Sequence, residues 1–294
     1  MRSLLGLLKE GRVLVSDGAW GTMLQERGLQ SGECPELWNV TRRDDVLAVA
    51  KSYVEAGADI ILTNSFGGSP IRLAHYGLED RAAELNEAAA DISREAAGRN
   101  HVVLGSMGPT GEISLVGSVT KDELYAGFAL QARGLKKGGV DGILVETMSA
   151  IDEAVSAVRA AIDSTGLEVA CTFTFDRTKN GQYRTMMGVS PAEMAEAMKA
   201  AAACVIGANC GNGFDQMIEV VREIRRIDSS TPLLVHANAG LPEYREGRLV
   251  YLETPDMVAE RAKILADLGA NIIGGCCGTT PEHIRAIVRE LKVS

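Results

Sequence analysis

The chain has 294 residues, of which 46% are hydrophobic and 23% are charged, and its formal net charge at pH 7 is −9. This balance is typical of a globular protein and excludes a disordered or collagen-like chain. No apolar run approaches the roughly 18 residues of a membrane helix, and the first residues turn charged too early for a secretory signal. The sequence therefore predicts a cytoplasmic protein that does not bind a membrane. The acidic excess and the lack of a basic stripe argue against nucleic acid as a partner.

Short apolar segments recur along the chain, and each is followed by a segment with helical periodicity. The predicted strands are Val13 to Ser16, Ile60 to Thr63, Val102 to Ser106, Gly142 to Val145, Val169 to Phe175, Cys204 to Ala208, Leu233 to Ala237 and Asn271 to Gly274. The predicted helices are Asp44 to Ala56, Ala82 to Gly98, Lys121 to Gly138, Ile151 to Ser164, Pro191 to Ala203, Phe214 to Ile227, Pro255 to Leu268 and Pro281 to Lys292.

Several helix starts carry a local signal, because Ser190, Thr254 and Thr280 each place a capping hydroxyl before a proline. Eight continuously apolar strands that alternate with helices favour a parallel sheet covered on its outer side. Closure into a single (β/α)8 TIM barrel is the predicted fold, with an open doubly wound sheet as the alternative. No linker or compositional break divides the chain, so residues 1–294 are predicted to form one domain.

Three cysteines follow predicted strands at the end of the barrel where such folds carry their chemistry. Cys210 follows the sixth strand, and Cys276 and Cys277 follow the eighth. Three thiolates with one coordination position left open are typical of a catalytic zinc site. The alternative is that these cysteines pack as small hydrophobic residues under the loops.

The other cysteines and the histidines are weaker candidates for site residues. Cys171 and Cys204 fall within predicted strands and are expected in the core, whereas Cys34 lies in the first long loop. His236 is the one histidine near a predicted strand end. Such a histidine is more often packed or hydrogen-bonded within the protein than part of a functional site.

Asp17 and Glu146 follow the first and fourth predicted strands, at the same end as the three cysteines. Burying a carboxylate without a partner is costly, so a cationic partner is implied, and a substrate ammonium would suit both groups. The alternatives are an ion pair with a loop arginine such as Arg184 or Arg245, or capping of the next turn. No glycine-rich phosphate loop is present, which disfavours nucleotide cofactors.

Eight segments, in the same order along the chain, resemble the homocysteine S-methyltransferase family. They are VSDGAWGTML (15–24), ILTNSFGGS (61–69), GSMGPTGE (105–112), ILVETM (143–148), RTMMGVSP (184–191), GANCGNG (207–213), HANAGLP (236–242) and GGCCGTTPEHI (274–284). The last segment, with its paired cysteines, is the most specific. The family includes the N-terminal module of cobalamin-dependent methionine synthase, the betaine-homocysteine enzymes and the S-methylmethionine enzymes.

The resemblance implies a (β/α)8 barrel with one zinc ion held by the thiolates of Cys210, Cys276 and Cys277. It implies that the sulfur of homocysteine takes the open coordination position and that Asp17 and Glu146 hold its ammonium group. The remaining predicted substrate contacts are Asn64, Ser65, Phe66, Ser106 and Asn238. Backbone N–H groups near Ser65, Phe66 and Ser106 are expected to bind the carboxylate, and the side-chain oxygen of Asn238 is placed to fill the fourth zinc position before substrate arrives.

The chemistry of thiols agrees with this assignment. A free thiol of pKa ~8.5 is mostly protonated at neutral pH, and only the thiolate attacks a methyl group. Zinc removes the proton, and three anionic sulfur ligands keep the substrate thiolate electron-rich, so no general base is required. The predicted function is therefore methyl transfer from an external donor to homocysteine, which forms methionine.

Two classes of donor remain open, because the chain has no room for a folate barrel and no Asp-x-His-x-x-Gly string typical of corrinoid-binding domains. One is a small onium compound such as betaine or S-methylmethionine, and the other is a separate methyl-corrinoid protein. An onium pocket is expected to offer aromatic faces, for which the candidates are Trp20, Trp38, Phe66, Tyr76 and Tyr183. The alternative functions are a non-catalytic zinc- or thiol-binding regulatory module, and a lyase or aldolase in which the cysteines are merely packed.

Overall fold

Eight parallel strands form the centre of the computed structural model, which describes residues 2–112, 119–211, 213–245 and 248–292. They are β1 (Leu14–Val15), β2 (Ile60–Leu62), β3 (Val102–Met107), β4 (Gly142–Met148), β5 (Glu168–Phe173), β8 (Val205–Cys210), β9 (Leu233–Ala237) and β12 (Ile272–Gly275). Each lies within a few residues of a predicted strand. Their residues are almost all buried, which explains why they stand out in the sequence as continuous apolar runs.

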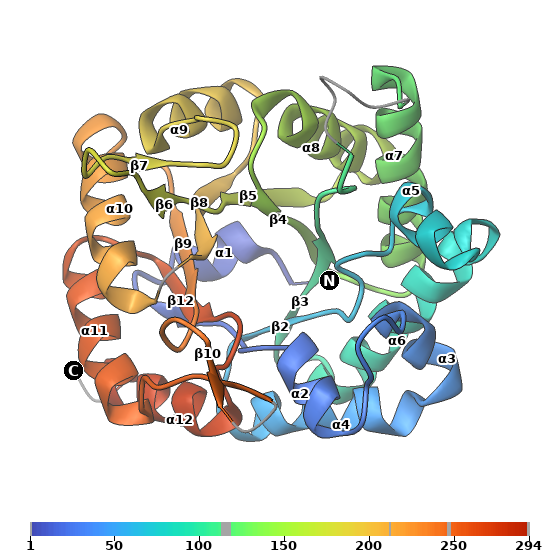
Figure 1. Ribbon diagram of the computed structural model, residues 1–294, viewed down its shortest axis with the longest axis horizontal. Coiled ribbons are helices and arrows are strands. Elements are labelled where there is room, and N and C mark those ends of the chain that lie inside the picture. Colours follow the sequence, from blue (N-terminus) through green and yellow to red (C-terminus); the bar gives the residue numbers. More distant parts are fainter. Residues whose placement is uncertain (1, 113–118, 212, 246–247, 293–294) are drawn as a thin grey trace.

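The strands close into a barrel. Their order is β1-β12-β9-β8-β5-β4-β3-β2, and the two ends of this row meet through a parallel bridge between Ser16 and Ile60. The N–H of Asp17 donates to the carbonyl of Ile60 at 3.0 Å across the same junction. Figure 1 shows the strands in the middle of the molecule with the helices in an outer ring. The predicted (β/α)8 TIM barrel is therefore confirmed, and the open sheet is excluded.

The outer helices match the predicted helices within three residues at each end. They are α4 (Arg43–Glu55), α6 (Ala82–Ala97), α7 (Lys121–Lys137), α8 (Ile151–Thr165), α9 (Pro191–Ala200), α10 (Phe214–Ile227), α11 (Pro255–Asp267) and α12 (Pro281–Lys292). Ser190 and Thr254 cap α9 and α11 by accepting a backbone N–H three residues on, as predicted. Thr280 differs, because its hydroxyl instead contacts the carboxylate of Glu282 and Nδ1 of His283.

A short helix that the sequence did not predict, α1 (Leu4–Leu8), closes the amino-terminal end of the barrel. Leu4 and Leu7 are buried against an apolar cluster inside the barrel that includes Leu14, Leu104 and Leu234. The interior at this end is therefore a packed core, and any cavity has to lie towards the opposite end.

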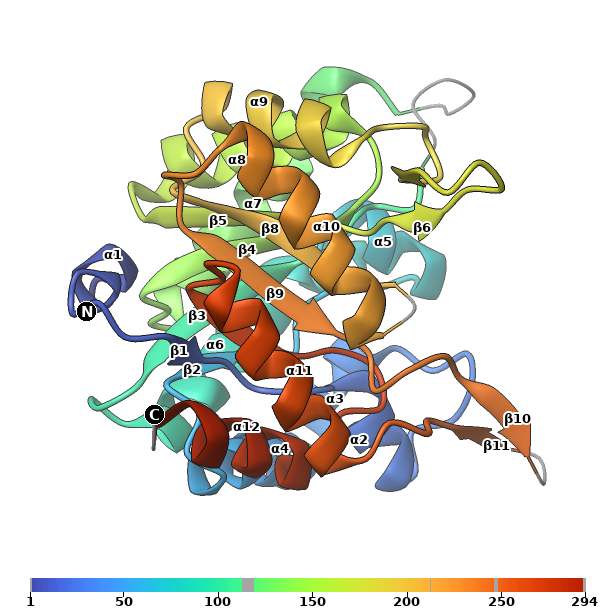
Figure 2. The ribbon, with the colours of Figure 1, turned by 90° about the vertical axis from the view of Figure 1, so that its left-hand side faces the viewer.

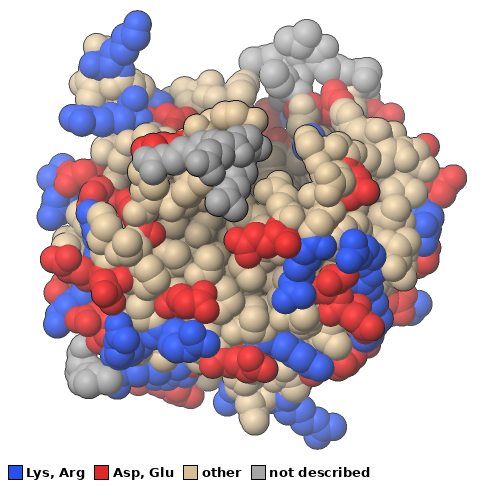
Figure 3. All heavy atoms as spheres, turned by 60° about the horizontal axis from the view of Figure 1, so that its bottom comes forward, with Lys and Arg blue, Asp and Glu red and all other residues tan. Residues whose placement is uncertain are grey.

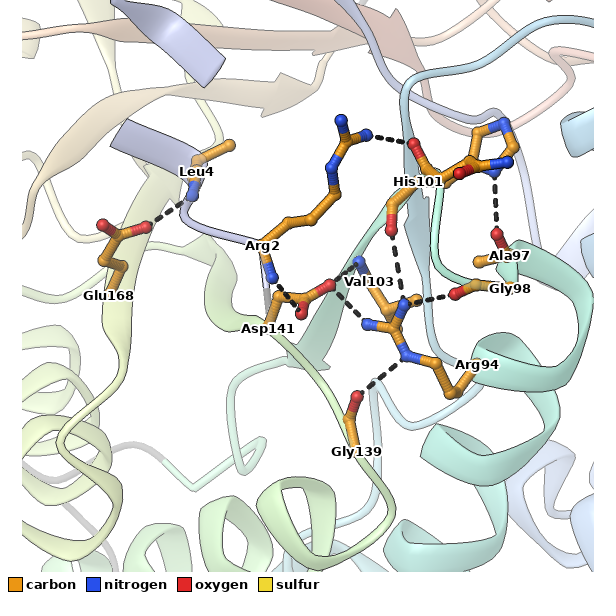
Figure 4. A network of polar contacts seen from close by, with 11 residues as sticks. Arg2, Leu4, Arg94, Ala97, Gly98, His101, Val103, Gly139, Asp141 and Glu168 are labelled. Atoms are coloured by element: carbon orange, nitrogen blue, oxygen red, sulfur yellow. Dashed lines mark hydrogen bonds and ion pairs between the residues drawn. The ribbon is translucent and has the colours of Figure 1, made fainter. Parts of the chain in front are cut away.

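Polar contacts hold α1 in place (Figure 4). The carboxylate of Glu168, at the start of β5, accepts hydrogen bonds of 2.6 Å from the N–H of Leu4 and from Oγ of Ser3. Asp141 accepts the N–H of Arg2 at 2.8 Å and forms an ion pair with Arg94. These groups satisfy the free N–H groups at the start of α1 and tie the first residues to the strands.

Shorter elements surround the other end of the barrel, and the sequence did not predict them. They are α2 (Gly21–Glu26), η1 (Pro35–Leu37), α3 (Trp38–Thr41), α5 (Pro70–Leu73), η2 (Ala74–Tyr76), η3 (Glu79–Arg81) and the strand pairs β6 (Asp176–Arg177) with β7 (Tyr183–Arg184) and β10 (Glu243–Arg245) with β11 (Arg248–Val250). Figure 2 shows both strand pairs extending from the end of the barrel opposite α1.

The surface carries charges of both signs. On the face shown in Figure 3, Lys and Arg side chains alternate with Asp and Glu and form no continuous basic surface. Among the described helices, none has the length and apolar character needed to cross a membrane.

Candidate functional site

A cavity of about 250 Å³ lies at the carboxyl end of the strands. Most of the predicted site residues line it: Asn64, Ser65, Phe66, Ser106, Glu146, Cys210, Cys276 and Cys277. Asp17 is completely buried beside the cavity, where its neighbours Gly18 and Trp20 form part of the wall. Asn238 is also buried and does not line the cavity itself.

Barrel closure brings three cysteines together. Cys210 ends β8, whereas Cys276 and Cys277 directly follow β12, and β9 separates these two strands. The three sulfur atoms all lie within 4.8 Å of one another, and the Sγ atoms of Cys210 and Cys276 are 3.0 Å apart. Cys210 has a φ of +61°, a left-handed conformation that turns the chain sharply at the end of its strand.

This group could hold a metal ion. Sulfur ligands about 2.3 Å from a tetrahedral zinc ion are about 3.8 Å apart, so the three thiols need only small side-chain movements. Asn238 donates from Nδ2 to the carbonyl of Gly211 at 2.6 Å, while its buried Oδ1 has no hydrogen-bond partner in the described part of the chain. The three sulfurs suit a tetrahedral ion and leave one coordination position open.

The thiols form one electrostatic unit. Hydrogen bonds from Cys210 and Cys276, together with one from the Tyr251 hydroxyl, lower the pKa of Cys277 to about 3. The hydrogen bond with Cys210 and the one with Cys277 raise the pKa of Cys276. These hydrogen bonds favour the thiolate form of Cys277, and a thiolate attracts a cation.

Asp17 is a buried carboxylate whose described hydrogen-bond donors are all uncharged. Its Oδ2 accepts the N–H of Leu62 at 2.7 Å and Nε1–H of Trp20 at 3.0 Å. Burial raises the pKa of Asp17 to about 7 in spite of these hydrogen bonds, and the charge of Glu146 adds to the increase.

Glu146 is a second buried carboxylate, and it faces the cavity. The hydroxyl of Ser106 donates a hydrogen bond to its Oε1. Burial raises the pKa of Glu146 to about 7 against the effect of this hydrogen bond. The partner of Glu146 among the described residues is thus a neutral hydroxyl, which does not compensate a negative charge.

The ion pairs considered from the sequence do not form among the described residues. Arg184 donates to the backbone carbonyl of Tyr183, and the side chain of Arg245 lies outside the described part of the chain. No described Lys, Arg or His side chain pairs with Asp17 or Glu146. Two buried carboxylates thus have no cationic partner in the described protein, which favours a cationic ligand.

The loop after β2 places the backbone N–H groups of Ser65 and Phe66 beside the cavity. The N–H groups of Ser65 and Ser106 are already bonded to the carbonyl and the hydroxyl of Thr63, at 2.9 and 3.0 Å. The N–H of Phe66 has no hydrogen bond within the described residues. The side-chain amide of Asn64 donates to the carbonyl of Pro35 at 2.8 Å and to Oδ1 of Asn39 at 2.9 Å, and so fixes the loop.

Two titratable residues that line the cavity, Glu36 and His236, were not among the predicted site residues. Glu36, from η1, is buried and accepts the N–H of Gly67 at 2.6 Å, and burial raises its pKa. His236 is fully buried, burial lowers its pKa to about 3, and its Nε2 has no partner in the described structure. Glu36 lies in a long loop, where no strand-end pattern could reveal it.

The remaining cysteines lie away from the cluster of three thiols. Cys171 is fully buried in β5, as predicted, and Cys204 packs against the apolar cluster at the α1 end of the barrel. The sulfur of Cys34 lies 3.3 Å from Oε2 of Glu36.

Of the aromatic candidates for a donor pocket, Trp20 and Phe66 line the cavity. Trp38 is buried elsewhere beneath Arg42, and neither Tyr76 nor Tyr183 is among the lining residues.

Known proteins share both the sequence and the fold. Residues 14–291 match the family model described as homocysteine S-methyltransferase. The chain is 34% identical over 304 residues to methionine synthase of Mycobacterium tuberculosis and 33% identical over 296 residues to that of Mycobacterium leprae. These alignments cover 97% and 94% of this chain but only 25% and 24% of the relatives, so the chain spans about a quarter of their length.

A solved structure has the same fold along the whole chain. The metallated form of the homocysteine methyltransferase MmuM from Escherichia coli superposes with a TM-score of 0.79 at 22% identity, over 97% of this chain and 98% of that chain. The similarity in fold agrees with the family match over residues 14–291. The chain therefore belongs to the homocysteine S-methyltransferase family.

Proposed function

We propose that this protein transfers a methyl group to the sulfur of homocysteine and so forms methionine. The observation that carries the proposal is that a three-thiol cluster and two buried carboxylates without a cationic partner among the described residues lie at one cavity. An amino acid that bears a thiol supplies what both parts require, a sulfur for the metal and an ammonium for the carboxylates. Membership of the homocysteine S-methyltransferase family supports the same reading.

The proposed metal is zinc, held by Cys210, Cys276 and Cys277. When bound, zinc lowers the pKa of a thiol ligand and supplies it as a thiolate at neutral pH. Asn238, held through Nδ2 by the carbonyl of Gly211, presents its unpartnered Oδ1 as the fourth donor in the absence of substrate.

The carboxylates and the loop after β2 orient the substrate. Glu146 and Oδ1 of Asp17 receive the ammonium group, and the free N–H of Phe66 receives the carboxylate. Burial lowers the pKa of His236 to about 3, so its ring is uncharged at pH 7 and adds no positive charge to the cavity. The proposed reaction needs no general base from the chain once the thiol proton has left.

The proposed donor is a small onium compound. Glu36 and Glu146 line the cavity, and no Lys or Arg is among its described lining residues. This negative charge favours a cation, and Trp20 and Phe66 offer aromatic faces to it. A separate methyl-corrinoid protein is the other donor class, and the donor experiment distinguishes the two.

A donor screen tests the proposal. Zinc-loaded protein is incubated with homocysteine and, in separate reactions, S-methylmethionine, betaine or methylcobalamin, and methionine is measured by mass spectrometry. We expect methionine with at least one donor, and its loss in Glu146→Gln but not in the control Glu153→Gln. Glu153 is also buried, but it accepts the N–H and hydroxyl of Thr110 outside the cavity. Homocysteine binding without methionine from any donor would instead support a non-catalytic binding module.

A further inference from the structure

Glu146 lies at an irregular point of its strand. The pairing of β4 with β5 changes register between Val145 and Met148, and Thr147 has a φ of +60°. A β-branched residue rarely adopts this left-handed conformation, and it persists only where the surrounding structure enforces it. Some contact therefore has to hold Thr147.

That contact comes from Asn209, a fully buried residue near the end of β8. Its Oδ1 accepts the N–H of Thr147 at 2.8 Å, and its Nδ2 donates to Oγ1 of the same threonine at 2.7 Å. The hydroxyl of Thr172, on β5 between the two strands, donates to Oδ1 of Asn209 at 2.8 Å. The asparagine is thus held in one orientation and binds both polar groups that Thr147 directs towards it.

Asn209 also directly precedes Cys210, the second non-glycine residue of the site with a left-handed backbone. One side chain therefore connects the strand that carries a thiol with the strand that carries the cavity carboxylate. The distance from thiol to carboxylate has to match the distance from sulfur to ammonium in the ligand, because both groups bind the same small molecule.

We propose that Asn209 is a positioning residue for substrate binding: it holds Thr147 in the left-handed conformation and so directs Glu146 towards the substrate ammonium at a fixed distance from Cys210. Asn209 touches neither substrate nor metal in this role. The inference rests on the proposed function, because it takes homocysteine as the ligand.

The role of Asn209 is tested by measuring how tightly the unchanged protein and the Asn209→Ala variant bind two thiol ligands. Calorimetry compares homocysteine with 4-mercaptobutanoate, which has the same thiol and carboxylate but no amino group. We expect Asn209→Ala to weaken homocysteine binding about 10-fold and to change binding of the second thiol by less than about twofold, with zinc content unchanged. If the variant binds both thiols equally more weakly, or neither more weakly, the proposal is overturned, because a merely structural role would not affect homocysteine more than 4-mercaptobutanoate.

Two further variants guard against simple misfolding. Glycine adopts a positive φ without penalty, so adding Thr147→Gly to Asn209→Ala is expected to restore part of the lost affinity. Thr172→Val removes one hydrogen bond to Asn209 but keeps both bonds between Asn209 and Thr147, so it is expected to weaken homocysteine binding less than Asn209→Ala does. A double variant as weak as Asn209→Ala would count against the proposal.

A crystal structure of substrate-free Asn209→Ala separates this inference from the proposed function. We expect Thr147 to leave the left-handed region and Glu146 to turn away from its cavity position. If both keep their conformation, the inference is overturned whether or not the protein methylates homocysteine.

Discussion

The indole of Trp20 donates a 3.0 Å hydrogen bond to Oδ2 of Asp17, and the N–H of Leu62 donates to the same oxygen at 2.7 Å. Two donors on Oδ2 leave Oδ1 with one long contact of 3.4 Å, to the hydroxyl of Ser16. Trp20 also lines the cavity and packs against the apolar cluster at its floor. Oδ2 of the carboxylate is therefore anchored, whereas Oδ1 has only the long contact with Ser16.

Trp20→Phe tests this anchoring, because phenylalanine keeps an aromatic ring but removes the N–H. Losing that hydrogen bond raises the pKa of Asp17 further, since the donor favours the charged form. We expect the KM for homocysteine to rise about 3- to 10-fold near pH 7 and to recover as the pH increases. The control is Trp38→Phe, at a buried tryptophan outside the cavity. A KM that rises equally at every pH would contradict the role of the N–H.

The pH dependence of ligand binding follows from the two carboxylates. Burial raises the pKa of both Asp17 and Glu146 to about 7, so each is ionised only as the pH rises through this value. An ammonium binds the ionised form, and its affinity is therefore expected to increase from about pH 6 to about pH 8. Methionine is the appropriate probe, because it has no thiol that titrates on the metal. A dissociation constant for methionine that stays flat over this range would exclude the two carboxylates as its partners.

The same shift predicts a stability cost at the site. The pKa of Glu146 is raised from 4.5 in the unfolded chain to about 7 in the folded protein, so the folded protein binds this proton more tightly. The contribution of Glu146 to the free energy of unfolding is therefore complete below pH 4.5 and is lost as the pH rises through 7. Glu146→Gln should therefore increase the free energy of unfolding at pH 8 by about 1 to 3 kcal/mol and change it little near pH 4.5. Urea denaturation at both pH values measures this, with Glu153→Gln as control. Destabilisation by Glu146→Gln at pH 8 would contradict the assignment of an uncompensated buried charge.

Metal content tests the thiol cluster directly. Cys276→Ser removes one of three sulfurs, and we expect its zinc content to fall below about 0.5 per chain, as measured by mass spectrometry of the metal. Cys204→Ser is the matched control, because its sulfur lies at the α1 end of the barrel. Full zinc content in Cys276→Ser, or equal loss in both variants, would rule out the three-cysteine site.

The contacts of α1 concern stability alone. Glu168→Ala removes the acceptor for Ser3, Leu4 and Leu5 at the start of this helix. We expect the free energy of unfolding to fall by about 1 to 2 kcal/mol with the KM for homocysteine unchanged, because the cavity lies at the other end of the barrel. Glu10→Ala, in an exposed pair with Arg12, serves as control in the same denaturation experiment. A changed KM in Glu168→Ala would show that the two ends are coupled.

The sequence predicted the elements whose residues are buried on regular faces. β9 spans Leu233–Ala237 and α10 spans Phe214–Ile227, both as predicted, because an apolar run or a helical period records burial directly. The hairpin of β6 with β7 was missed, since two-residue strands leave no such period. Helix α1 was missed for a similar reason, because its position depends on Glu168, more than 160 residues away.

The residues of the site likewise fall into those that the sequence selected and those that only the structure revealed. Residue type and position after a strand were enough to select Cys210, Cys276 and Cys277 as candidate ligands and Asp17 and Glu146 as candidate partners of an ammonium. Glu36 gave no signal, and Asn209 stood out only as a polar residue at a strand end, because a carboxylate in a loop and an amide at a strand end acquire meaning only from what they contact. The donation of the Ser65 and Ser106 N–H groups to Thr63 is equally invisible in the sequence.

The amino-acid sequence by itself determined the barrel, the order of its elements and the chemical types at the strand ends, because local periodicity and residue chemistry are properties of neighbouring residues. Only the tertiary structure decided which of those groups lack a hydrogen-bond or charged partner among the described residues. Closure brings β8 and β12 together at one mouth, buries Asp17 and Glu146 without a cation among the described residues, and sets Asn209 against Thr147. These relationships join residues far apart in the chain, and burial, hydrogen bonding and charge compensation between them exist only once the barrel has closed.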